Sequence, residues 1–69
     1  MALNREQQLL IDFLNTSKIS EGMQAAIYMT VQGHEIEMCL FLKDNPEATG
    51  EEALKKAREI ARADEDDDA

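Results

Sequence analysis

The chain has 69 residues, a formal net charge of −8 and a single cysteine. This length leaves room for one domain with a modest core, one cysteine excludes an internal disulfide, and no apolar run approaches the roughly 20 residues that span a bilayer. The first residues lack the basic and apolar regions of a signal peptide, so we expect a soluble, cytoplasmic protein without membrane contact.

The negative charge is concentrated near the C-terminus, where consecutive acidic residues occupy positions 64–68. Residues 1–63 hold ten acidic and seven basic side chains, a net charge of −3. Because like charges repel, we expect a single helical domain over 1–63 followed by a disordered acidic tail at 64–69. Direct nucleic-acid binding is disfavoured, since the chain has neither a basic patch nor an aromatic platform.

The first predicted helix spans about residues 4–15. Asn4 can cap its start, and Gln7 stands at the capping-box position three residues later. Apolar residues recur on one side at helical spacing. They are Leu3, Leu10 and Leu14, with Ile11 and Phe13 broadening the stripe. This pattern is typical of a short amphipathic helix.

The segment 20–43 is predicted to be one long central helix. Ser20 is a suitable N-cap, and Asn45-Pro46 is a strong stop because the residue before proline avoids the helical region. Glycine lowers helix stability by about 1 kcal/mol relative to alanine, so we expect a kink or break near Gln32-Gly33.

The apolar residues of this central segment exceed what one helix face can hold. One stripe comprises Met23, Ala26, Ile27, Val31, His34, Met38 and Phe41. A second stripe, on the far side of a continuous helix, comprises Met29, Ile36 and Leu40.

A rival interpretation of the same segment is a β-hairpin. Residues 27–31 and 35–42 also alternate with period two, and Gln32-Gly33 could form the turn of an α+β fold. Against this, the segment is rich in Met, Ala, Leu and Glu, and Gln-Gly is a weaker turn signal than Asn-Gly. The helix is the favoured prediction.

The third predicted helix spans 49–63. Thr49 and Glu52 form a capping box, and acidic residues precede basic ones along the segment, as the helix dipole favours. Its apolar stripe is made mainly of alanines, which let a helix lie close to its neighbour but add little core volume. The predicted fold is therefore an all-α, three-helix mini-domain.

Candidate chemistry is sparse. His34 and Glu37 have helical spacing that could hold a metal, but one histidine and one carboxylate fall short of a zinc site. Cys39 is interpreted as a small buried hydrophobe, and Glu35 with Glu37 as part of a solvated face. We therefore expect no enzyme activity, no catalytic residue, no bound metal and no cofactor.

The surplus of apolar residues in the central segment predicts an interface. The first helix is short and the third is rich in alanine, so part of the second stripe would stay exposed, which on soluble proteins usually marks an interaction site. The interface candidates are Tyr28, Met29, Ile36 and Leu40. Small domains also gain stability by association, so we expect a homo-oligomer, most simply a dimer.

Two classes of function remain open. In the first, the chain is a small acidic regulator or inhibitor that binds a larger protein, its charge steering the encounter. In size and charge it is similar to small phage-encoded antagonists of host defence, although no motif links it to a family. In the second, an oligomer sequesters a small nucleotide-like ligand between subunits, which would require Arg or Lys at the pocket.

Overall fold

The computed structural model describes residues 3–66, with side chains through residue 63, as four helices without a strand. These are α1 (Arg5–Thr16), α2 (Glu21–Thr30), α3 (Glu35–Asp44) and α4 (Gly50–Asp66). The predicted all-α class is confirmed, and the hairpin alternative is not supported.

The predicted central helix is two helices, α2 and α3, so the three-helix arrangement is corrected to four. The break falls at the expected place, since Gly33 adopts a left-handed φ of 90°. A single helix would have turned its two apolar stripes to opposite sides. The break lets α2 and α3 each turn one face into the same core, which explains why the folded-back arrangement wins.

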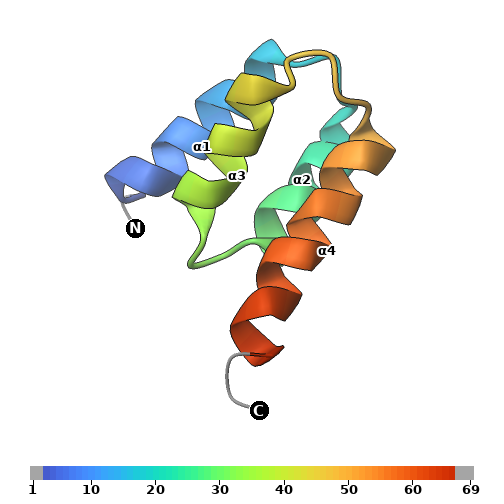
Figure 1. Cartoon of the computed structure of the whole chain (residues 1–69). Coiled ribbons are helices and arrows are strands. Elements are labelled where there is room, and N and C mark those ends of the chain that lie inside the picture. The colour runs from blue at the N-terminus through green and yellow to red at the C-terminus, as the bar shows by residue number, and fades with distance from the viewer. Residues whose placement is uncertain (1–2, 67–69) are drawn as a thin grey trace.

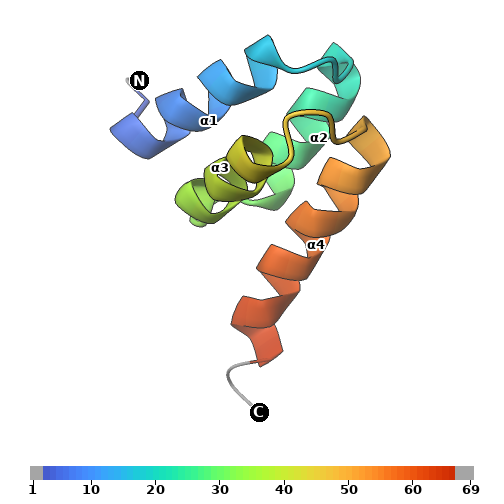
Figure 2. The same cartoon turned by 45° about the horizontal axis from the view of Figure 1, so that its top comes forward.

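The helices associate as two pairs. α1 packs mainly against α3, and α2 packs mainly against α4, with smaller α3–α4 and α1–α2 contacts joining the pairs. Within each pair the two helices run side by side in the same direction (Figure 1, Figure 2). Partners in a pair are therefore never neighbours in the sequence.

The core lies where the two pairs meet and draws on all four helices. Its buried apolar side chains are Leu10, Leu14, Ile19, Ile27, Val31, Met38, Cys39, Leu42, Ala53, Ala57 and Ile60. The alanines of α4 allow close packing on α2, as expected from the sequence. The two helices also approach closely at Gly50, where an added Cβ would lie 2.7 Å from Cγ of Met23.

Both predicted capping boxes form. The backbone N–H of Gln7 donates to Asn4 Oδ1 at 2.8 Å, while the N–H of Asn4 donates to Gln7 Oε1 at 3.0 Å. At α4 the N–H of Glu52 donates to Thr49 Oγ1 at 3.1 Å, and the N–H of Thr49 donates to Glu52 Oε1 at 2.9 Å. These bonds satisfy backbone donors that a helix start leaves without partners.

The other predicted boundaries also match. Ser20 caps α2 by accepting from the N–H of Met23 at 3.4 Å, and α3 ends at Asp44, just before Asn45-Pro46. Helix α4 runs to Asp66, so residues 64–66 of the predicted acidic tail are helical. The remainder of that tail, 67–69, lies outside the described residues.

We expect Gly33→Ala to lower the free energy of unfolding by about 1–2 kcal/mol, because an L side chain is strained at positive φ. Gly22→Ala is the matched control. Gly22 lies in α2 with nothing within 4 Å of an added Cβ, so alanine there should raise stability by about 0.5–1 kcal/mol. Urea unfolding followed by circular dichroism measures both. A Gly33→Ala chain as stable as the parent would contradict the left-handed turn.

We expect Glu52 to make the stability of α4 depend on pH. Hydrogen bonds from Thr49, first from its backbone and then from its side chain, lower the pKa of Glu52 below its ordinary value of 4.5. The stabilisation is therefore present above the ordinary pKa and lost as pH falls through the lower folded value.

The neutral variant Glu52→Gln isolates this effect from the other carboxyl groups. Urea midpoints of parent and variant, compared from pH 7 to pH 3, should differ most at neutral pH and converge in acid. A constant difference over that range would show that Glu52 ionisation adds nothing to the cap.

Candidate functional site

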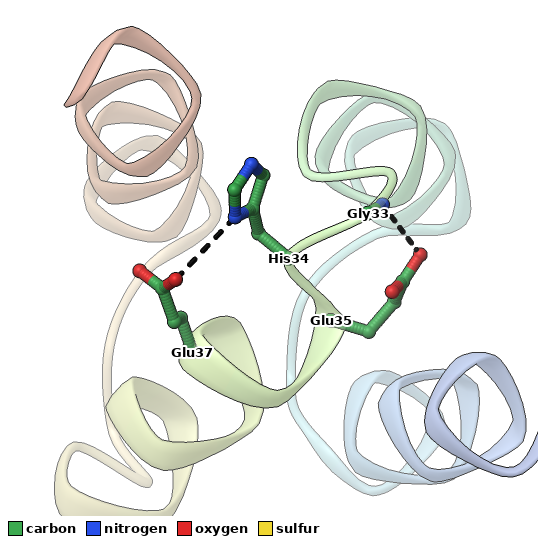
Figure 3. Close-up of polar contacts among 4 residues, drawn as sticks. All are labelled: Gly33, His34, Glu35 and Glu37. Atoms are coloured by element: carbon green, nitrogen blue, oxygen red, sulfur yellow. Dashed lines mark hydrogen bonds and ion pairs between the residues drawn. The ribbon is translucent and has the colours of Figure 1, made fainter. Parts of the chain in front are cut away.

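The turn between α2 and α3 gathers the polar side chains closest to the apolar core. The N–H of Gly33 donates to Glu35 Oε2 at 3.0 Å, and the N–H of His34 donates to the carbonyl of Val31 at 2.7 Å. Figure 3 shows the Glu35 side chain folded back towards Gly33. Glu35 is only 7% exposed, so its predicted place on a solvated face is wrong. The carboxylate is buried because it closes the turn.

His34 and Glu37 do come together, as their spacing indicated. Nδ1 of His34 lies 3.4 Å from Oε1 of Glu37, and the two side chains point towards each other in Figure 3. Among the described residues, no group of three or more His, Cys, Asp or Glu side chains could hold a metal ion. The contact joins the N-cap residue His34 to the first turn of α3, where the carboxylate of Glu37 also meets the positive end of the helix dipole.

Cys39 is buried in the core, as the sequence predicted. Burial raises the pKa of its thiol, and the negative charge of Glu35 raises it further. The thiolate is the reactive form of cysteine, so this environment suppresses nucleophilic chemistry at Cys39.

We expect Cys39 to react with a disulfide reagent such as DTNB at pH 7.5 at least about tenfold more slowly in the native chain than in urea, because both burial and the raised pKa oppose thiolate attack. The release of thionitrobenzoate measures the rate. Cys39 is the single cysteine, so Cys39→Ser supplies the background. Equal native and unfolded rates would contradict the buried position.

The four interface candidates lie in three different places. Ile36 and Leu40 are 44% and 56% exposed, and their i,i+4 spacing puts them on one side of α3. Met29 is 66% exposed, but on α2, which packs mainly against α4. Tyr28 is half-buried and lines a shallow pocket of about 270 Å³ between α1 and α2. The break at Gly33 thus separates Met29 from the other two members of its predicted stripe.

A side chain of α1 that the sequence did not single out takes the place of Met29. Two hollows between α1 and α3 give the register of these helices. Glu6 and Ile36 line one hollow, and Phe13 and Lys43 line the other. Leu9 is three residues after Glu6 and four before Phe13, and Leu40 is four residues after Ile36 and three before Lys43. This register puts Leu9, which is 40% exposed, within about one residue of the level of Leu40 on the helix packed beside it.

We call Leu9, Ile36 and Leu40 the α1–α3 surface. The three large apolar side chains are exposed on two helices that pack together although they are separated in the sequence by α2. Leu9 was missed because it lies off the stripe of Leu10 and Leu14, and only the pairing of α1 with α3 reveals its neighbours. Exposed charged residues border the surface on both helices. They are Arg5, Glu6 and Asp12 on α1, and Glu37, Lys43 and Asp44 on α3.

A second feature is an acidic hollow of about 530 Å³ where α3 turns into α4. Asp44, Glu47 and Glu52 contribute carboxylates to its lining, and half-buried Phe41 contributes an aromatic ring. Nζ of Lys56 lies 5.9 Å from the centre of that ring, a cation–π distance that ties α4 to α3. This contact gives the Phe41 ring a structural role.

None of the described helices is long and apolar enough to cross a membrane. Comparison with protein-family models, with curated proteins and with solved structures finds no match to this chain. Function must therefore be inferred from the chemistry of the chain's own surface.

Proposed function

We propose that this chain is a small, acidic, non-enzymatic interaction protein that binds other proteins through the α1–α3 surface. One observation carries the proposal: Leu9, Ile36 and Leu40 are 40%, 44% and 56% exposed on two helices packed side by side. Scattered single apolar residues are normal on protein surfaces, whereas contiguous ones usually mark contact sites.

The framework beneath this surface suits a binding role. Capping boxes or caps fix the starts of α1 and α2, and Glu35 closes the turn that begins α3. Side chains held on such helices meet a partner with little further loss of conformational freedom. The residues with the most reactive side chains are committed to structure, since Cys39 is buried and His34 contacts Glu37.

A regulator or inhibitor of a larger protein fits these features best. The net charge of −8 would speed the encounter with a basic partner, and the apolar surface would supply the contact. A nucleotide-like ligand suits the surface less well, because Arg5 and Lys43 are the only cations on its border. Four of the seven basic residues lie instead on α4, at Lys55, Lys56, Arg58 and Arg62. The single buried cysteine supports a reducing, cytoplasmic location.

The test is the double variant Ile36→Ser/Leu40→Ser, with Met29→Ser as the matched control. Both replace exposed apolar side chains, so each variant should keep its helical circular dichroism and lose no more than about 1 kcal/mol of stability. Cross-linking in host lysate, read by quantitative mass spectrometry, should show proteins captured equally by the parent and the control. The double variant should lose them at least tenfold.

Circular dichroism of both variants excludes misfolding as the cause of lost capture, because an unfolded variant would be detected before capture is compared. Capture that survives in Ile36→Ser/Leu40→Ser, or that fails equally in Met29→Ser, would place the binding site elsewhere and overturn the proposal.

A further inference from the structure

We propose that a second copy of this chain occupies the α1–α3 surface, packed face to face about a two-fold axis. This inference rests on the proposed function, since it names the partner of the same surface, here a second copy of the chain in place of a larger basic protein. Three properties of the surface carry it: an apolar centre, a border with charges of both signs, and an arrangement of those charges that is complementary to itself.

The apolar centre comes from both helices at the same level. Leu9 of α1 and Leu40 of α3 are exposed at nearly the same level of two packed helices, with Ile36 one turn before Leu40. A two-fold axis through this point brings the same side chains of the second copy onto them. Such an isologous contact needs no other surface, because each copy supplies both halves.

The border carries charges of both signs, two basic and four acidic. Arg5 and Lys43 stand there, although only three of the seven basic residues lie outside α4. Among the described residues, neither of these two cations forms an ion pair within its own chain. Both are therefore available to a partner that offers carboxylates at the matching positions.

The chain itself offers such carboxylates. Arg5 and Asp12 are seven residues apart and share the outer side of α1, one on each side of the level of Leu9. If two copies pack with α1 antiparallel to α1, Arg5 of each meets Asp12 of the other. If they pack in parallel, with α1 on α3, Asp12 meets Lys43 instead. Asp12 therefore faces a cation in both arrangements.

The size of the surface sets the strength of the association. Helix α1 has 12 residues. Two adjacent helices of about this length offer on the order of 400 Å² per copy, against about 800 Å² in a standard interface. We expect a reversible dimer with a Kd in the micromolar range or weaker, populated at high protein concentration.

Sedimentation velocity of the full chain from 20 µM to 1 mM in 0.15 M salt tests the proposal. The parent should sediment as a concentration-dependent dimer, and Asp12→Lys should weaken dimerisation about tenfold or more, since each reversal acts twice in a two-fold dimer. Glu59→Lys, at an exposed position of α4, changes the net charge by the same amount as Asp12→Lys and should leave the Kd unchanged.

The decisive step is rescue by a second charge reversal. Adding Arg5→Asp to Asp12→Lys should restore the dimer if the copies are antiparallel, and adding Lys43→Asp should restore it if they are parallel. Restoration by either supports the proposal and fixes the orientation. A parent that is monomeric at 1 mM, or a dimer that Asp12→Lys does not weaken, overturns it, as does failure of both rescues.

This outcome is separable from that of the proposed function. Suppose that the parent is monomeric and that its capture of another protein is lost in Ile36→Ser/Leu40→Ser. The surface would then belong to a different partner, and only the proposal of a second copy would be overturned. If that double variant changes neither self-association nor capture, both proposals fail.

Discussion

The backbone between α2 and α3 governs how this chain can bury its apolar residues. Gly33 takes a left-handed φ of 90°, and its N–H is held by the buried carboxylate of Glu35. With the turn in place, Ile27 of α2, Val31 at the end of that helix and Met38 of α3 enter one core and are fully buried. A straight helix over the same residues would have left one of its apolar sides without cover.

The same turn determines the surface. By changing the direction of the chain, it leaves Met29 on α2 and carries Ile36 and Leu40 to the side of α1. Leu9 then completes an exposed group that belongs to no single segment. The proposed site is thus a product of helix pairing, and the chain builds it without a dedicated loop or an inserted element.

Local signals accounted for most of the fold. Caps at Asn4, Ser20 and Thr49 are short-range interactions whose donors and acceptors lie within a few residues, so they can be predicted from spacing alone. Met29, Ile36 and Leu40 are exposed, as helical periodicity indicated, but the break between α2 and α3 divides the stripe that they were predicted to form. The break near Gly33 was expected. Whether it bends one helix or separates two depends on the burial gained when α2 and α3 pack into the same core, which is a tertiary effect.

The sequence could not predict which helices pack against each other. No local rule states that α1 packs on α3, so Leu9 could not be joined to Leu40 and Met29 could not be set apart. The burial of Glu35 was missed for a related reason. Its partner is a backbone N–H exposed by the left-handed turn, and periodicity carries no information on such a bond.

The pairing of α1 with α3 and of α2 with α4 has a consequence for how the chain reaches its native state. Each major contact skips one helix, so no two consecutive helices enclose a core of their own. Folding then requires most of the chain at once, which raises contact order and slows the search relative to a bundle of sequential hairpins. During synthesis α1 must therefore wait for α3, and α2 for α4, before its main packing partner is present.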